Sequence, residues 1–162
     1  MGWFSSTPTR DRKAERDREE AEARLAIAAH EVGHAIGCAA AGIRVHAVRI
    51  WGDQGQVDAD GIEASDQAKV DGYLVMMLCG WAAGAEWMHR HHGYSRSAAL
   101  SWARQGARSD WADFRRKKRD GSHNGGWYER QAQNLVRANW SRIERHAREL
   151  ARTGRLTGSR FN

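Results

Sequence analysis

Cysteine and proline are scarce in this chain of 162 residues, which contains two cysteines and one proline. Cys38 and Cys79 lie in apolar stretches of helical pattern, so we expect two reduced, buried thiols that pack as small hydrophobic side chains. A disulfide or a thiolate metal ligand is the less favoured alternative. The proline, Pro8, follows Thr7, and this pair is typical of the first turn of a helix.

Long apolar runs are also missing from the sequence. No stretch of about 18 apolar residues is present, so we predict no membrane-spanning helix. The first six residues, MGWFSS, lack the basic stretch and the apolar core of a signal peptide. We therefore expect a cytoplasmic protein.

Basic residues outnumber acidic ones, 26 Lys and Arg against 20 Asp and Glu, which gives a formal net charge of +6. Such an excess can serve contact with nucleic acid, acidic lipid or an acidic partner, but here it is spread over both ends of the chain. The densest basic run is Arg115–Arg119. We interpret this run as a solvated helix C-terminus, which cations stabilise, in preference to a nucleic-acid interface.

Length and composition fit one domain with its own core, because 41% of the residues are hydrophobic. The patterns predict an α+β fold that is mostly helical, with four or five helices, a small β-sheet and a C-terminal helical bundle. We expect a charged helical extension over residues 1–24, the domain over 25–157 and a tail over 158–162. Residues 153–162 are expected to be mobile.

Hydrophobic periodicity predicts where the elements lie. One helix should run from Pro8 to about Gly42, a good helix C-terminal residue. A second helix, capped by Ser65, carries Gly80 and Gly84, which would let another helix approach closely. The remaining predicted elements are strands over 45–51 and 56–62 and helices over 97–119 and 127–152.

The chemistry is concentrated in His30-Glu31-Val32-Gly33-His34, within the first predicted helix. Residues four apart share one face of a helix, so both imidazoles can reach one zinc ion at about 2.0–2.1 Å. Glu31 would project beside the metal, where it can take a proton from a zinc-bound water. The spacing therefore predicts a zinc hydrolase with Glu31 as general base. A catalytic zinc site needs a third protein ligand as well.

This motif and its flanks, Ala29–Ile36, resemble the active-site helix of the FtsH-type peptidase domain, the proteolytic half of membrane-bound AAA proteases. Later segments resemble that family in the same order, so that the resemblance spans about Leu25 to Thr157. The similar segments are the strand Val45–Ile50, the Leu-Gly-Gly-Arg-Ala-Ala-like stretch Met77–Ala83, the Gly-Ala-x-Asn-Asp-Leu-like stretch Gly106–Trp111 and the final helix Leu135–Thr157.

The resemblance implies a third zinc ligand, because the aspartate of Gly-Ala-x-x-Asp coordinates the metal in that family. Carried over to this sequence, the ligand is Asp110, and a carboxylate oxygen at about 2.0–2.2 Å is chemically suitable. Glu86 and Asp113 are the alternatives. Asp110 is expected on the helix predicted over 97–119, packed across the first helix.

The chain departs from the family pattern between Trp81 and Gly106. Trp81 replaces an arginine, and Gly84 and Ala85 stand where the family has two glutamates. The segment is also longer and contains three clustered histidines, which we interpret as a solvated basic turn in preference to a second metal site. These are His89, His91 and His92. Among the other histidines, His123 in a Gly-rich loop is a candidate substrate contact, whereas His46 and His146 are expected to be structural or on the surface.

We therefore predict a zinc-dependent metalloendopeptidase that cleaves flexible or unfolded protein substrates. The sequence contains no Gly-x-x-x-x-Gly-Lys motif, so we expect activity without ATP in isolation, with a separate unfoldase or adaptor as a candidate partner. The rival prediction is a catalytically inactive FtsH-like module that binds zinc or a partner, with its basic helix contacting nucleic acid. A zinc hydrolase acting on another amide is a weaker rival.

Overall fold

The computed structural model describes residues 8–162 and, in that part of the chain, contains six α-helices and a small three-stranded antiparallel sheet. The predicted α+β, mostly helical fold is therefore confirmed. The predicted cap at Thr7 lies outside the described residues. Every helix that is described is too short or too polar to cross a membrane.

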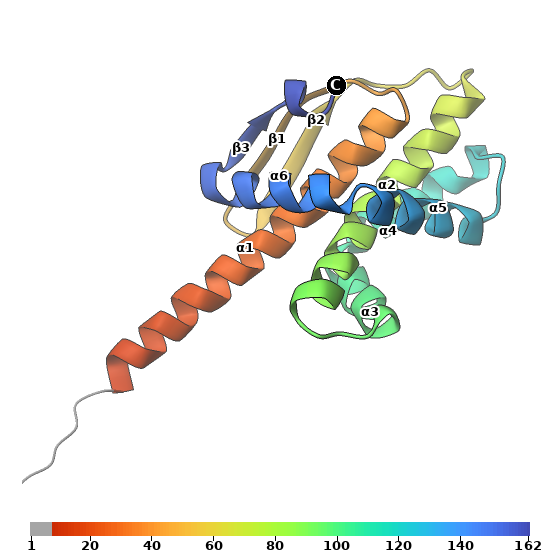
Figure 1. Cartoon of the computed structure of the whole chain (residues 1–162). Helices are drawn as coiled ribbons and strands as arrows, with labels where there is room; N and C mark the ends of the chain where they lie inside the picture. The colour runs from red at the N-terminus through yellow and green to blue at the C-terminus, as the bar shows by residue number, and fades with distance from the viewer. Residues whose placement is uncertain (1–7) are drawn as a thin grey trace, which may run out of the picture.

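Figure 1 shows the order of the elements along the chain. The elements are α1 (Pro8–Ala40), β1 (Val45–Trp51), β2 (Gln54–Ala59), α2 (Gln67–His91), α3 (Arg96–Gly106), α4 (Arg108–Lys117), the 3-10 turn η1 (Lys118–Asp120), α5 (Gly125–Ala138), α6 (Trp140–Thr153), β3 (Arg155–Thr157) and the 3-10 turn η2 (Gly158–Arg160).

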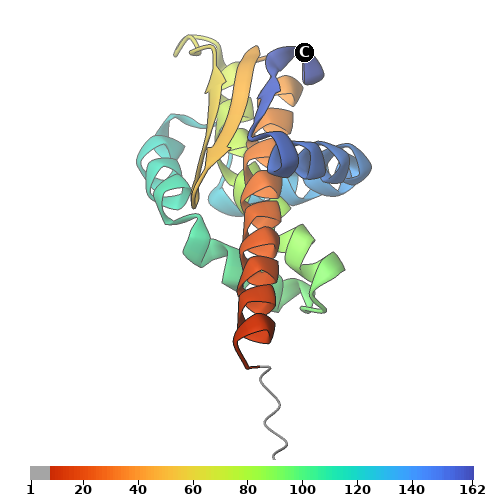
Figure 2. The same ribbon diagram turned by 90° about the vertical axis from the view of Figure 1, so that its left-hand side faces the viewer.

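Helix α1 is the central element, and its second half is buried among the others. It packs on α2 and α6 and contacts strands β1 and β2. Ala28, Ala29, Val32 and Ala35 are fully buried in this contact. Residues 11–23 are exposed, and Figure 2 shows these N-terminal turns extending beyond the remaining elements. The solvated helical extension expected from the charge run is thus part of one continuous helix with the core segment.

The sheet lies against α1 in the order β2-β1-β3. Strand β1 buries Val45, Val48 and Ile50, and the turn to β2 needs only two residues because Gly52 adopts φ +54°. Strand β2 therefore begins two residues earlier than predicted and ends at Ala59. Since β1 is paired on both sides, the outer edge of β2 is left without a strand partner in the described part of the chain.

Two predicted helices are each broken into two. The backbone leaves helical geometry at Ala107 (φ −106°, ψ 27°) and at Asn139 (φ −108°, ψ 14°). Apolar residues are buried on both sides of each break, so hydrophobic periodicity continues through it. The N-terminus of α2 also differs from the prediction, because the side chain of Asp66, and not that of Ser65, accepts a hydrogen bond from the Lys69 amide (3.1 Å).

The prediction of mobile residues 153–162 is wrong. Strand β3 pairs with β1, and Leu156 and Phe161 are buried against the core. The Asn162 side chain accepts a hydrogen bond from the Val45 amide (3.0 Å) and donates one to the Val45 carbonyl (2.8 Å). These partners lie more than 100 positions away in sequence, which is why local pattern did not reveal them.

Helices α1 and α2 cross closely because glycine faces the partner helix at the contact. A Cβ added at Gly33 would lie 2.5 Å from the Cys79 carbonyl oxygen and 2.6 Å from the Ala83 Cβ. Gly84 was also predicted to allow close approach, but a Cβ there would meet only the Ala103 Cβ, at 3.8 Å. Gly33 is therefore required for the close helix contact, whereas the contact at Gly84 has room for a side-chain methyl group.

We predict that Gly33→Ala destabilises the protein by about 1–3 kcal/mol, because the added methyl overpacks the contact between α1 and α2. The matched change Gly84→Ala has room for its methyl and removes a helical glycine, which stabilises by roughly 0.5–1 kcal/mol. Chemical denaturation of both variants measures the difference. Equal stability of the two variants would contradict this description of the crossing.

Candidate metal centre

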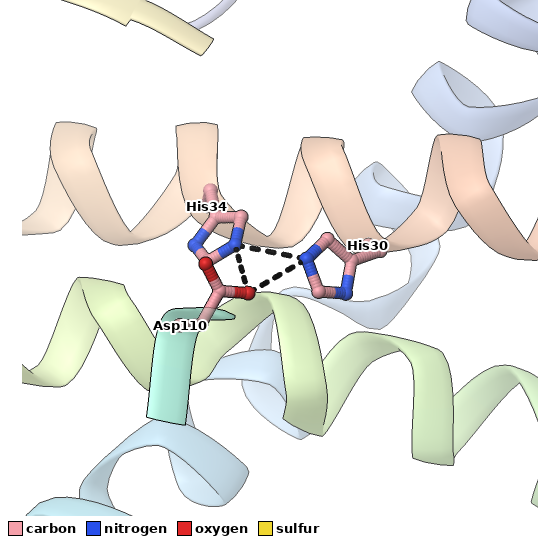
Figure 3. Close-up of side chains that lie close together, drawn as sticks. All are labelled: His30, His34 and Asp110. Carbon is pink, nitrogen blue, oxygen red and sulfur yellow. Dashed lines mark hydrogen bonds and ion pairs between the residues drawn. The ribbon is translucent and has the colours of Figure 1, made fainter. Parts of the chain in front are cut away.

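His30 and His34 lie one turn apart on α1, and both imidazoles face Asp110, which lies in the first turn of α4 (Figure 3). The His30 Nε2 and His34 Nε2 atoms are 3.0 Å apart. The Asp110 Oδ2 atom lies 3.0 Å from the first and 3.1 Å from the second. The two nitrogens and the oxygen form a nearly equilateral triangle, and these three residues could hold a metal ion.

The triangle fits a small divalent ion. Ligand atoms about 2.0–2.2 Å from a tetrahedral zinc are roughly 3.3 Å apart, so the edges need to lengthen only slightly. The break at Ala107 directs α4 so that Asp110 meets α1. Asp110 is thus on the fourth helix, because the predicted helix over 97–119 is interrupted.

The second nitrogen of His34 is held by α2. His34 Nδ1 lies 2.9 Å from the Met76 carbonyl oxygen, and a carbonyl can only accept, so Nδ1 carries the proton. The other nitrogen, Nε2, therefore faces the triangle, where it can bind a metal ion once it is deprotonated. Hydrogen bonding of the outer nitrogen is the usual way in which a protein orients a metal-binding histidine.

The close contacts within the triad shift the pKa values of His34 and Asp110. Burial opposes charge on His34, but the hydrogen bond and Coulombic attraction to Asp110 together raise the His34 pKa to about 9. Burial likewise opposes charge on Asp110, yet hydrogen bonds from His30 and His34 hold its pKa far below the usual value. A metal ion would replace the proton on His34 as the positive partner of this carboxylate.

Glu31 lies beside the triad and is only 9% exposed. Burial raises its pKa, and the nearby His34 and His30 partly offset the effect. The backbone of β2 covers it, because a Cβ added at Gly55 would lie 2.4 Å from Glu31 Cγ. The carboxyl group lines the same cleft as the triad. This position suits a group that exchanges protons with a ligand in the cleft.

Two glycines, Gly80 and Gly55, contribute to the site in ways that the sequence did not predict. A Cβ added at Gly80 would lie 2.3 Å from His34 Nε2 and 2.7 Å from His30 Nε2, so the imidazoles occupy the space that a side chain would fill. Gly55 makes room for Glu31 in the same way. The sequence signal for Gly80 was its place on a helical strip of small residues, whereas Gly55 sits in a turn-like segment with no signal of its own.

Neither alternative third ligand joins the triad. The Glu86 carboxylate binds Arg90 Nε (2.6 Å) and Arg96 Nη1 (2.9 Å), and its hydrogen bonds to these arginines outweigh burial and lower its pKa. Asp113 lines the cleft but is paired with Arg116. Asp110 is therefore the carboxylate that geometry places with the two histidines.

The other histidines have separate partners. His89 contacts the Tyr94 carbonyl (2.7 Å), His91 contacts Glu144 (2.8 Å) and His92 contacts Glu22 (3.4 Å). The expected turn is instead the end of a helix, because His89 and His91 lie in the last turn of α2 and His92 is its C-cap residue. His123 is stacked on Trp127 at 3.8 Å and does not line the cleft, so its predicted contact with substrate is not supported.

The remaining histidines and both cysteines lie outside the metal-ligand triad, at the surface or in the core. His46 is an exposed strand residue that contacts Asp60 (2.6 Å), and His146 is buried on α6. Cys38 and Cys79 are buried and unpaired, as predicted, and burial raises the pKa of Cys38 to about 11. Both thiols therefore stay protonated at neutral pH.

No protein-family model matches the chain, and no curated protein is similar to it.

We predict that Asp110→Ala lowers metal content well below the one ion per chain expected of the unsubstituted protein, because it removes one of three ligands. The matched control is Asp113→Ala, three residues further along α4, which leaves the triad intact. Elemental analysis after gel filtration measures both. Full occupancy in Asp110→Ala, or equal loss in Asp113→Ala, would show that the metal is held elsewhere.

Proposed function

We propose that this protein is a zinc-dependent metalloendopeptidase similar to the FtsH-type peptidase domain. The observation that carries the proposal is the convergence of His30, His34 and Asp110 beside Glu31 in one cleft. Two imidazole nitrogens and one carboxylate oxygen form a donor set that suits zinc and leaves a coordination position open. When bound, zinc would polarise the peptide carbonyl and lower the pKa of water.

The chain's own residues would supply binding and proton transfer. The cleft is about 1560 Å³, larger than the roughly 300–1,000 Å³ of small-molecule pockets, which favours several residues of a peptide as ligand. Strand β2, whose outer edge is unpaired in the described structure, borders the cleft, since Gln54, Gly55, Gln56 and Val57 are lining residues. An extended peptide would add to this edge as a further strand.

Glu31 is proposed to be the general base. It would accept the proton of the attacking water on its carboxylate and return a proton to the leaving amine. Its burial beneath β2 raises the carboxyl pKa and so makes the carboxylate a stronger base than an exposed glutamate. As ligands, His30 and His34 would be deprotonated at Nε2, with the Met76 carbonyl orienting His34.

The proposed substrates are flexible or unfolded proteins, because a peptide must be extended to lie along β2. The sequence contains no Gly-x-x-x-x-Gly-Lys motif, and we propose that the isolated chain cleaves such substrates without ATP. Stably folded domains would be cut only through rare opening, unless a separate unfoldase or adaptor delivers them.

We predict that Glu31→Gln retains the metal but loses about 10²–10⁴-fold in the rate of hydrolysis of a disordered protein, because the amide cannot accept the proton. Glu19→Gln, an exposed change on the same helix, is the matched control and keeps full activity. Cleavage is followed by gel electrophoresis, with and without a chelator. Equal activity of Glu31→Gln would refute the role of Glu31, and metal-loaded protein without any cleavage would favour the inactive binding module.

A further inference from the structure

The cleft over the metal-ligand triad has a charge opposite to that of the chain. Basic residues outnumber acidic ones in the sequence, yet Lys117 is the one Lys or Arg that lines the cleft in the described part of the protein. Glu31 and Asp110 are among its acidic lining residues, and a divalent ion in the triad would offset their charge. The remaining acidic lining residues are Glu22, Asp53, Asp60, Asp113 and Asp120.

Two of these carboxylates bracket the strand that borders the cleft. Asp53 directly precedes β2 and Asp60 directly follows it, and both are exposed. Asp60 contacts only an exposed histidine, His46, and within residues 8–162 neither aspartate is paired with a lysine or an arginine. Asp113 and Asp120, by contrast, have the neighbouring Arg116 and Arg119 as partners. The Asp53 carboxylate, and the Asp60 carboxylate oxygen that does not contact His46, are therefore available to a ligand.

A buried polar group independently points to a ligand in this cleft. Glu31 is 9% exposed as a residue, and within residues 8–162 its carboxyl group has no hydrogen-bond partner, only the nearby charges of His34, His30 and Asp110. The Glu31 oxygens are not among the fully buried, unpartnered polar atoms of the described residues, so they can be reached from the cleft by a ligand or water that would satisfy them. The cleft is thus a binding site with acidic groups around it, and those groups select among ligands.

We propose that the cleft selects extended peptides that carry lysine or arginine side chains near Asp53 and Asp60. This selection rests on the proposed function, because the peptide lies along β2. The two aspartates are seven positions apart, a distance of about 24 Å along a strand, so two cationic residues roughly seven positions apart would meet both. Carboxylates lining a cleft concentrate cationic ligands there even when the protein as a whole is basic.

The sign of the preference makes this proposal testable. A protein of net charge +6 attracts acidic peptides non-specifically, so tighter binding of a basic peptide requires a local acidic site. The probes are three fluorescent, disordered peptides of about 14 residues, long enough to span β2. They differ only at two positions seven apart, which hold arginine, glutamine or glutamate. Binding is measured by fluorescence anisotropy at low salt, in Glu31→Gln protein so that bound peptide is not cleaved.

The arginine peptide should bind about three- to tenfold more tightly than the glutamine peptide, and the glutamate peptide more weakly. Adding Asp53→Asn and Asp60→Asn should abolish the preference. The matched control, Asp11→Asn with Asp17→Asn, changes net charge equally at exposed sites of α1 outside the cleft and should keep it.

Equal binding of the three peptides, tighter binding of the glutamate peptide, or no binding at all would overturn the proposal. So would equal loss of preference in the control pair, since the effect would then be one of net charge. An arginine preference that depends on Asp53 and Asp60, in a protein whose unsubstituted form cleaves none of the peptides, would support the selective cleft and contradict the proposed peptidase activity. The two failures are therefore distinguishable.

Discussion

The close crossing of α1 and α2 is the constraint on which the site depends. Gly33 lets the backbone of α1 approach the Cys79 carbonyl, and Gly80 leaves the space into which both imidazoles project. The same contact brings the Met76 carbonyl to His34 Nδ1, which sets the tautomer of that ligand. A helix pair held further apart would keep the histidine spacing but lose the oriented Nε2 atoms.

Two other elements, α4 and β2, add the remaining parts of the site on either side of this helix crossing. On one side, the break at Ala107 aims the first turn of α4 at α1, so that one Asp110 oxygen lies about equally far from both histidines. On the other side, the backbone of β2 at Gly55 packs closely against Glu31, which is 9% exposed. Strand β3 forms the far edge of the sheet, and β2 forms the edge beside the cleft. The proposed metal ligands, the proposed base and the proposed peptide-binding strand therefore depend on the contacts that α1 makes with α2, with Asp110 and with β2.

Features that depend on contacts between residues close in sequence could be predicted, whereas features that depend on contacts between distant segments could not. The pairing of His30 with His34 is set by one helical turn, and the end of α1 near Gly42 is set by a glycine at φ +69°, so both were accessible from local pattern. Asp110 is 76 positions from His34 and could be proposed only through a family resemblance, although the structure places it at the triad. Burial of Phe161 and the cover of Glu31 by Gly55 depend on packing between distant segments, which periodicity does not encode.

The most direct test of the metal centre is X-ray diffraction from crystals of the zinc-loaded protein at energies on either side of the zinc absorption edge. We expect one anomalous peak about 2.0–2.2 Å from His30 Nε2, His34 Nε2 and Asp110 Oδ2, with Glu31 beside the metal and not bound to it. A peak at His89, His91 or His92, or none at the triad in protein that retains zinc, would contradict it.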